Sequence, residues 1–453
     1  MKNAALKSVI PFMGLMLIFS LLFLDTNGQV TASAYDNNWP EWRGYHNTGA
    51  ALKGNPPADF SETKNVKWKI DIPGKGHATP IVWGNQIIVQ TAVPTAQKPA
   101  DAAGDESETE ERSWMTANRA QNIYKYFVIS VDKNTGKINW QTEVNEEFPL
   151  ESTHELGSWA SNSPVTDGEN IFAYFGSRGL YCLDFNGNVL WSRDFGQLEK
   201  HMSFGEGSSP AVCKNNVYVQ WDHEGQSFIY AIDKKTGEDA WVDKRDEPTS
   251  WSTPLLLNVN GKTQVITSAT TKVRGYDAST GDVIWECSGL TRNVIPNPVY
   301  ADGILYVMSG FRGNALKAID LANAKGDIDG TDVILWEHNE NTPYTPCPVL
   351  MDGKLYFMRT NNGFLSCLDA KTGEVYYSSE RLDGISTLYS SPTGAGGKLY
   401  IVAGGVVNVI KAGPEFEIIA KNTIDDDFHA SPVVIGDELF LRGFTKLYCI
   451  SEK

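Results

Sequence analysis

The chain has 453 residues and a net charge of −16 at pH 7. Such an acidic surface repels nucleic acid and anionic lipid, so neither is an expected partner. Hydrophobic residues make up 41% of the chain, enough for a large core, and the 41 glycines suit a fold with many tight turns.

The N-terminus has the pattern of a secretory signal peptide. Two lysines precede an apolar stretch from Val9 to Leu24, and small residues just before Tyr35 offer a cleavage site. The stretch is short for a membrane span, although an uncleaved anchor is the alternative. We expect residues 1–34 to be a signal peptide of a periplasmic or secreted protein that has no transmembrane span after cleavage.

A proline that follows a small or polar residue recurs along the chain and marks an internal repeat. Successive prolines are 84, 46, 44, 44, 50, 44 and 40 residues apart, and the first gap contains an acidic insertion at residues 94–122. The spacing predicts eight units of propeller-blade length. The eight dipeptides are Thr79-Pro80, Ser163-Pro164, Ser209-Pro210, Thr253-Pro254, Asn297-Pro298, Cys347-Pro348, Ser391-Pro392 and Ser431-Pro432.

Each unit has the same internal order of strand and turn signals. A short apolar run follows the proline, then an aromatic and β-branched run such as Ile304-Leu305-Tyr306-Val307. A third run ends in Asp, and a Gly turn and a Trp follow it, as between Asp233 and Trp241. Four strand-length runs without room for a helix predict one antiparallel blade. The Trp of the last run is expected to wedge between neighbouring blades.

These units predict an all-β fold, an eight-bladed β-propeller of four-stranded antiparallel blades. The seventh unit is degenerate, because Lys411 replaces the Asp and no Trp follows. The eighth lacks a last strand, since the chain stops at Lys453, and the isolated run around Trp68 can supply it. We therefore expect an N-terminal extension at 35–65, a propeller at 66–453 and ring closure by residues 66–71, which would remove two open sheet edges.

The six cysteines do not form a disulfide framework. Cys182, Cys367 and Cys449 recur at one repeat position, and equivalent positions of different blades point away from each other. They are expected to be small buried core residues. The chain also lacks a Cys-x-x-Cys pair for a metal, a redox centre or a covalent haem.

The repeat of Ala-x-Asp, Gly turn and Trp resembles that of the pyrroloquinoline-quinone-type (PQQ-type) repeat proteins, over about residues 39 to 451. Trp39-Pro40-Glu41-Trp42-Arg43-Gly44 and the stretch from Ser163 to Trp191 are similar to secreted bacterial members. The resemblance implies one of two functions: a quinone-dependent dehydrogenase of alcohols or sugars, or a non-enzymatic scaffold such as the lipoprotein that assists outer-membrane protein assembly. Fold alone does not choose between them.

Loop positions indicate where a ligand would bind. In a four-stranded antiparallel blade, the loop before the first strand and the loop between the second and third strands lie on one face. Aromatic, His and Arg side chains of these loops would form a funnel for a planar or anionic ligand, or instead fill the channel and pair with acids. The candidates are His77, Trp159, Arg178, Trp251, Arg312, Tyr344, Arg359, Tyr389, His429 and Arg442.

The dehydrogenase alternative requires PQQ, Ca²⁺ and a carboxylate base. Oxygen-bearing residues near the expected loops are Glu155, Asn162, Glu206 and Asn297, but their spacing is not diagnostic and loop capping is the simpler explanation. The vicinal Cys pair of many alcohol-oxidising members is absent. The acidic stretch from Asp327 to Asp332 resembles a Ca²⁺ loop, but His338 stands where an EF-hand needs Glu.

The sequence therefore favours an exported propeller that binds an unknown protein or small-molecule ligand on its loop-rich face. No cofactor is certain, and a monomer is expected. The alternative is the PQQ- and calcium-dependent dehydrogenase of an alcohol or sugar.

Overall fold

The computed structural model describes residues 32–99 and 117–452. The expected signal peptide, apart from its last three residues, and most of the acidic insertion lie outside this range. Within it, two hydrogen bonds join the ends of the insertion, from the Thr95 N–H to the Ile123 carbonyl and from the Ile123 N–H to the Gln97 carbonyl. No helix in the described part of the chain has the length and apolar character needed to cross a membrane.

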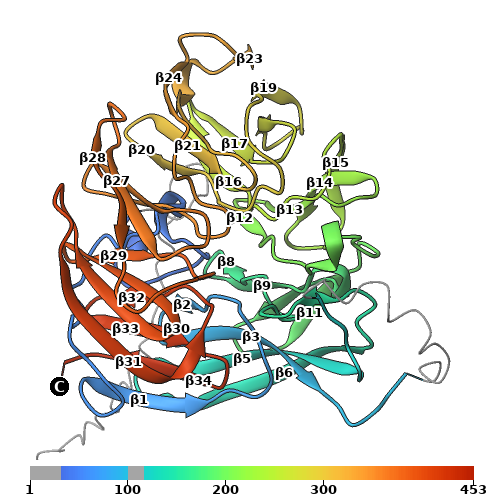
Figure 1. Cartoon of the computed structure of the whole chain (residues 1–453). Helices are drawn as coiled ribbons and strands as arrows, with labels where there is room; N and C mark the ends of the chain where they lie inside the picture. Colours follow the sequence, from blue (N-terminus) through green and yellow to red (C-terminus); the bar gives the residue numbers. More distant parts are fainter. Residues whose placement is uncertain (1–31, 100–116, 453) are drawn as a thin grey trace, which may run out of the picture.

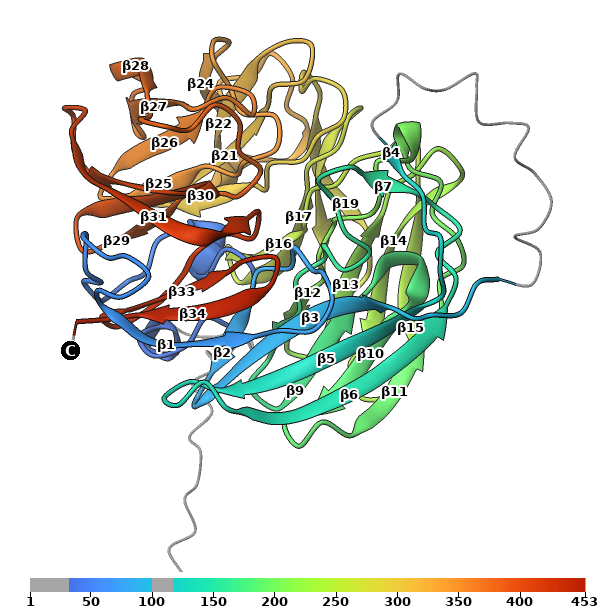
Figure 2. The ribbon, with the colours of Figure 1, turned by 60° about the horizontal axis from the view of Figure 1, so that its bottom comes forward.

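Short β-branched and aromatic runs, separated by turns, give the described residues eight blades arranged in a ring, as expected (Figures 1 and 2). In blades one to six, chain order runs from the innermost strand to the outermost. The strands of the first four blades are β2 (Ile81–Trp83), β3 (Gln86–Pro94), β5 (Tyr124–Asp132) and β6 (Ile138–Glu147); β8 (Val165–Thr166), β9 (Asn170–Tyr174), β10 (Leu180–Asp184) and β11 (Val189–Arg193); β12 (Ala211–Cys213), β13 (Asn216–Trp221), β14 (Ser227–Asp233) and β15 (Asp239–Arg245); and β16 (Leu255–Val259), β17 (Lys262–Thr267), β18 (Val273–Asp277) and β19 (Val283–Cys287).

The last four blades complete the ring. Their strands are β20 (Val299–Ala301), β21 (Ile304–Ser309), β22 (Ala315–Asp320) and β24 (Ile334–His338); β25 (Val349–Met351), β26 (Lys354–Met358), β27 (Phe364–Asp369) and β28 (Val375–Arg381); β29 (Thr393–Ala395), β30 (Lys398–Lys411) and β31 (Ile418–Phe428); and β32 (Val433–Ile435), β33 (Glu438–Arg442), β34 (Lys446–Ile450) and β1 (Val66–Asp71). In the seventh blade, β30 covers the length of two strands, with Gly404 at a φ of 53° in its middle.

Short elements connect or extend the blades. They are α1 (Ala32–Tyr35), the single 3₁₀ turns η1 (Tyr45–Asn47), η2 (Gly176–Arg178), η3 (His201–Ser203) and η4 (Leu321–Asn323), the pair β4 (Ala117–Asn118) and β7 (Thr153–His154), and β23 (Gly326–Asp327).

The N-terminal strand closes the ring, as the sequence predicted. β1 pairs antiparallel with β34 and takes the outermost position of the eighth blade, with Trp68 opposite Cys449. The first and last described strands of the propeller are therefore hydrogen-bonded neighbours, and the ring does not end in two free sheet edges.

A closed ring of eight hydrogen bonds surrounds the channel and explains the repeated dipeptides. In each blade, the backbone N–H of the residue before the proline donates to the side chain of the equivalent residue in the next blade. Distances are 2.8–3.1 Å, or 3.3 Å where the acceptor is the sulfur of Cys347. The order is Thr79, Ser163, Ser209, Thr253, Asn297, Cys347, Ser391, Ser431 and back to Thr79. The proline lacks an N–H and suits the inner edge strand.

The outer seams between blades repeat one Trp contact. The Trp241 indole N–H donates to the Ala278 carbonyl of the next blade at 2.9 Å, and its ring covers Gly281, where a Cβ would lie 2.8 Å from Trp241 Cε3. Gly281 also has a φ of 81°, so both space and backbone favour glycine there. The same donation to the next blade occurs from Trp68 to Lys133, Trp140 to Phe185, Trp191 to Lys234 and Trp336 to Lys371.

The seam between the fourth and fifth blades differs. Trp285 is fully buried and its N–H donates to Gln264 Oε1 of its own blade at 3.0 Å. The tight Gly turn of the other blades is replaced here by the connection that holds β23, which pairs parallel with β19. Ile328 of this connection packs in the same core cluster as Trp285. The acidic stretch thus extends the fourth blade, and its Asp329 carboxylate accepts from the Ser288 N–H.

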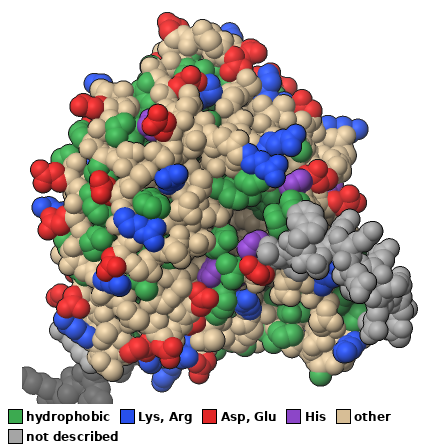
Figure 3. All heavy atoms as spheres, in the orientation of Figure 1, with side chains coloured by type: hydrophobic (Ala, Val, Ile, Leu, Met, Phe, Trp, Pro, Cys, Tyr) green, Lys and Arg blue, Asp and Glu red, His purple; other side chains and the backbone are tan. Residues whose placement is uncertain are grey.

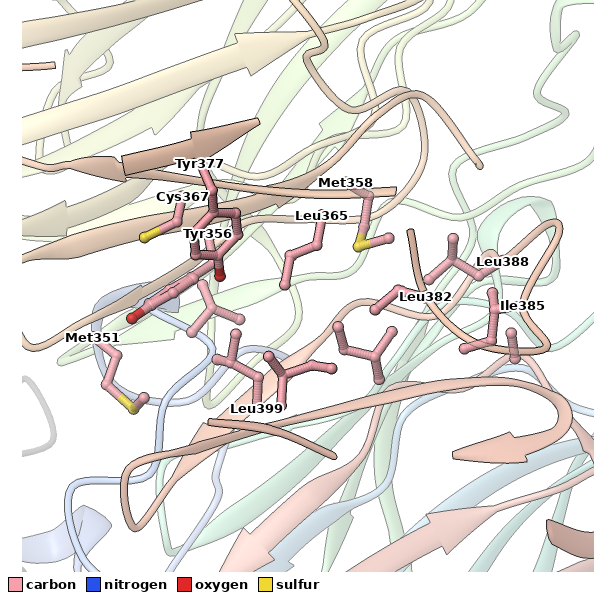
Figure 4. Packing of buried hydrophobic residues seen from close by; sticks show 14 of the residues in the cluster. Met351, Tyr356, Met358, Leu365, Cys367, Tyr377, Leu382, Ile385, Leu388 and Leu399 are labelled. Atoms are coloured by element: carbon pink, nitrogen blue, oxygen red, sulfur yellow. The ribbon is translucent and has the colours of Figure 1, made fainter. Parts of the chain in front are cut away.

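Small residues stand opposite the outer aromatic rings. Cys182 pairs with Trp191, Cys449 with Trp68, and Cys367 with Tyr377. All six cysteines are free and buried, as expected. Figure 4 shows Cys367 and Tyr377 toward one end of the apolar cluster between the sixth and seventh blades and Leu388 toward the other.

Candidate functional site

The loops before the first strands and the loops after the second strands surround a cavity of about 420 Å³ at one mouth of the channel, here called the mouth cavity. In Figure 3, hydrophobic and His side chains gather around a hollow on this face. The aromatic and His side chains that line it are Trp42, His77, His154, Phe204, Trp251, Phe311, Tyr344, Tyr389 and His429. Leu156 and Ile295 add apolar surface, and the side chains of Ser161, Glu206, Thr345 and Asn361 are polar.

The N-terminal segment forms the floor of the mouth cavity. It crosses the inner strands, with paired backbone hydrogen bonds from Trp39 to Val82 and a bond from the Gly394 N–H to the Gly49 carbonyl. The Trp42 indole N–H donates to Ser431 Oγ of the inner ring at 3.4 Å, and its side chain lines the cavity. The cavity is therefore blind, with the loops as its walls and the N-terminal segment beneath it.

One wall is a column of stacked rings. The His77 ring stacks on Phe444 at 4.9 Å and on His429 at 5.0 Å, and His429 stacks on Tyr389 at 5.6 Å with an angle of 6° between the planes. Tyr389 then meets His154 at 5.7 Å. Five rings from five loops thus form a continuous aromatic surface.

Burial keeps the histidines of this column uncharged. It lowers the pKa of His77 well below 6.5, and the neighbouring His429 adds to this effect. Burial likewise lowers the pKa of His429 and of His154. His77 Nε2 and His429 Nδ1 are buried and have no hydrogen-bond partner among the described residues. At neutral pH the column presents apolar ring faces rather than cations.

The opposite wall contains Tyr344, Phe311 and Trp251. Tyr344 and Phe311 stack at 4.7 Å with an angle of 28° between the planes. The Trp251 indole N–H donates to the Gly205 carbonyl at 2.7 Å, which fixes the ring against the preceding loop. These contacts hold the rings in place before any ligand arrives.

The sequence-predicted ligand residues divide into two groups. His77, Trp251, Tyr344, Tyr389 and His429 line the mouth cavity. The others, Trp159, Arg178, Arg312, Arg359 and Arg442, do not.

Each of the outlying residues has other contacts. Trp159 packs on Tyr124 and donates to the Glu151 carbonyl at 3.0 Å. Arg312 and Arg359 are exposed and lie over the rings of Phe311 and Phe364.

The remaining two arginines are buried. Arg178 pairs with Glu147 at 2.9 Å and Glu206 at 3.3 Å. Arg442 donates to the Gly443 carbonyl, and burial lowers its pKa to about 10. Neither guanidinium lines the mouth cavity, and the ion pairs of Arg178 match the alternative in which the arginines pair with acids.

The Glu151 carboxyl group lies beside the mouth cavity. Glu151 shares a small side pocket with Arg178 and Glu206, and its Oε1 accepts from the Lys200 N–H at 2.7 Å. Burial, and then the nearby Glu206 carboxylate, raise the pKa of Glu151 to about 8. This group is mostly protonated at neutral pH, and its Oε2 is buried without a partner among the described residues.

Of the four oxygen-bearing residues considered for calcium and PQQ, Asn162 and Glu206 line the side pocket that Glu151 shares, while Glu155 and Asn297 do not. Asn297 Oδ1 accepts from the Thr253 N–H in the inner ring, and Asn162 donates to the Ser208 carbonyl. Glu206 accepts from the Ser177 N–H at 2.8 Å and from Arg178, while Glu155 is exposed. The described residues contain no cluster of three or more His, Cys, Asp or Glu side chains able to hold a metal ion. This donor set therefore does not fit Ca²⁺ with PQQ.

Sequence reasoning missed several residues of the cavity. Trp42 was noted only as part of a resembling motif, and its place at the floor depends on how the N-terminal segment crosses the channel. Phe311 and Phe204 also line the cavity. Phe311 directly precedes the predicted Arg312 in the same loop, so the loop was identified but the wrong side chain was chosen.

Comparisons with known proteins agree with this architecture. The model of the family described as outer membrane protein assembly factor BamB matches residues 125–377, more than half of the chain. The chain belongs to this family. The match runs from the third strand of the first blade to the outer strand of the sixth, so it covers the regular repeats.

Individual relatives share little sequence identity with this chain. Outer membrane protein assembly factor BamB of Yersinia pestis is 22% identical over 343 residues, which are 70% of this chain and 78% of that protein. Polyvinylalcohol dehydrogenase of a Sphingopyxis species is 21% identical over 254 residues, 45% of this chain and 38% of that enzyme. The structure of quinohemoprotein alcohol dehydrogenase from Comamonas testosteroni superposes with a TM-score of 0.61 at 11% identity, over 93% of this chain and 82% of that one. These likenesses establish the PQQ-type propeller fold.

Proposed function

We propose that this protein is an exported binding scaffold and that the mouth cavity is its ligand site. The observation that carries the proposal is the blind cavity itself, with rings from several blades fixed around one space. Its volume falls in the range of about 300–1,000 Å³ typical of small-molecule sites. Binding of a partner protein, as the assembly-factor relatives suggest, would use the same loop-rich face. Export rests on the signal-like N-terminus.

The dehydrogenase alternative has weaker support. The polyvinylalcohol dehydrogenase relative and the alcohol dehydrogenase fold favour it, but fold likeness at this identity does not carry activity. Of the oxygen donors that it would need, Asn297 is engaged in the inner ring and Glu206 in an ion pair, while Glu155 is exposed and does not line the cavity. We therefore place binding first and derive no redox step.

The test uses N-phenyl-1-naphthylamine, a neutral two-ring dye that fluoresces in apolar sites. The purified protein should bind it saturably at one site. Tyr389→Ala and Phe311→Ala, which remove rings from facing walls, should each weaken binding about tenfold, because each removes a stacking face. Arg359→Ala is the control, since Arg359 lies outside the cavity and should leave binding unchanged.

Two outcomes would count against the proposal. Absence of saturable dye binding, or equal loss in the control and the cavity variants, would remove the mouth cavity as the ligand site. Ca²⁺-dependent binding of PQQ with a new absorption band and alcohol oxidation would support the dehydrogenase instead.

A further inference from the structure

We infer that the mouth cavity selects uncharged, planar ring systems over anions of the same shape, and that Trp42 enforces this selection by separating the cavity from Arg43. The inference rests on the proposed function and specifies its ligand class. It narrows the sequence expectation of a planar or anionic ligand contacted by aromatic, His and Arg side chains.

None of the described side chains that line the cavity is a lysine or an arginine. The two nearby lysine ammonium groups lie over rings, Lys75 at 4.2 Å from the centroid of Phe444 and Lys200 at 5.6 Å from that of Trp251. The column of His77, His429 and Tyr389 ends in uncharged rings at neutral pH, and Tyr344 with Phe311 faces it from another part of the ring. A planar ligand would extend these stacks, since offset ring contacts are favourable at the centroid distances seen here. The walls therefore recognise ring shape.

Charge in the cavity works against an anion. Glu206 is the one charged side chain among the described lining residues, apart from the three histidines, and it is an acid. Its carboxylate already accepts from Ser177 and from Arg178, which Glu147 also engages. A ligand carboxylate or sulfonate would lose its hydration and find no cationic partner on the walls, which is costly.

A buried cation with unpaired donors directly follows Trp42 in the chain. Arg43 is fully buried, and its Nη2 donates to the carbonyls of Pro348 at 3.1 Å and Pro392 at 2.7 Å. Its Nε and Nη1 have no partner among the described residues. Arg43 does not line the cavity, whereas the preceding residue, Trp42, does. The indole thus closes off a guanidinium that would otherwise attract anions.

A matched dye pair tests this selection. N-phenyl-1-naphthylamine and 1-anilinonaphthalene-8-sulfonate share one ring body and differ by a sulfonate. The full chain should bind the neutral dye at least about tenfold more tightly, at pH 8, by fluorescence titration. Trp42→Ala should reduce the ratio of the two dissociation constants, sulfonate dye over neutral dye, at least about threefold, because it opens a path from the cavity to Arg43. Trp42→Phe should leave this ratio unchanged.

A second variant does not depend on the floor. Glu206→Gln removes the acidic charge of the lining and should strengthen binding of the sulfonate dye at least about threefold, with little change for the neutral dye. Thermal unfolding curves of each variant confirm that the compared proteins are folded.

The outcomes separate the two proposals. If the wild-type chain binds both dyes equally, or binds the sulfonate more tightly, the selection is overturned while the ligand site stands. The same holds if folded Trp42→Ala and Glu206→Gln both keep the wild-type ratio. If neither dye binds, the proposed function falls and the inference falls with it.

Discussion

The outer seams and the mouth cavity are built from the same blades in opposite ways. At the seams, Trp68, Trp140, Trp191, Trp241 and Trp336 make one contact five times, each donating to a carbonyl of the next blade. At the mouth, the position two residues before each inner-ring residue lines the cavity in all eight blades but holds unlike side chains, such as His77, Trp251 and Ile295.

This difference separates stability from recognition. Because the same wedge recurs at five seams, the joining of these blades does not depend on their loops, and the ring survives variation in the loops. The mouth is free to combine unlike side chains, since they are not needed to join the blades. We therefore expect substitutions at the seams to change the free energy of unfolding, and substitutions at the mouth to change binding first.

The largest expected effect is the loss of a seam Trp. Trp241→Ala should lower the free energy of unfolding by about 3–5 kcal/mol, the range for large aromatic deletions in a core, without changing dye binding at the mouth. Trp285→Ala should cost at least as much, because that ring is fully buried. Urea denaturation monitored by circular dichroism gives the values. Trp83→Ala, at the end of β2 and partly exposed, should cost less. Equal midpoints for all three variants would contradict the wedge role.

A comparison of two glycines tests whether the ring of Trp241 leaves room for a side chain beneath it. Gly281 and Gly261 both have a φ of 81°, but a Cβ at Gly281 would meet Trp241 while a Cβ at Gly261 would meet nothing within 4 Å. Both Ala variants should lose about 1–2 kcal/mol through the left-handed backbone. Gly281→Ala should lose about 1–3 kcal/mol more, through overpacking. Equal losses of the free energy of unfolding in the two variants, measured by urea denaturation, would show that the Trp241 ring moves aside without a cost in stability.

Much of the seam could be predicted from the sequence, and less of the mouth. Recurrence exposed the Trp series and the prolines, because a repeated contact leaves a repeated residue. The hydrogen bond of Trp285 within its own blade could not be foreseen, since at this seam the longer connection of the next blade replaces the tight Gly turn. At the mouth, strand order placed Tyr389 and His429 in the right loops. It could not tell that Arg178 would be paired with Glu206.

A smaller effect on the free energy of unfolding is expected at the inner ring, the closed ring of eight hydrogen bonds that surrounds the channel. Thr253→Val removes the acceptor of the Ser209 N–H, a bond of 2.9 Å, and keeps the side-chain shape. The buried N–H is left without a partner, which costs about 1–3 kcal/mol. Thr236→Val is the matched control: its hydroxyl accepts from the Glu238 N–H on an exposed turn, where water can replace the bond. Similar unfolding free energies for both variants would show that the inner ring adds no stability of its own.

The smallest effect on stability is expected within the mouth and depends on pH. His77→Phe keeps a ring against both Phe444 and His429, which also contact each other, and should change the free energy of unfolding by less than about 1.5 kcal/mol at pH 8. Burial, together with His429, Lys75 and Arg442, lowers the pKa of His77 well below 6.5 in the folded chain.

The sign of the pH effect follows from proton uptake. Below about pH 6.5 the unfolded chain takes up a proton at this residue while the folded chain does not, so the wild type loses stability as the pH falls. The Phe variant has no such proton and should lose less between pH 6.5 and pH 5, although His154 and His429 retain part of the dependence. Urea midpoints at pH 8, 6.5 and 5 measure this difference. Parallel curves for the two proteins would mean that His77 is charged in the folded state, which would also place a cation in the wall of the mouth cavity.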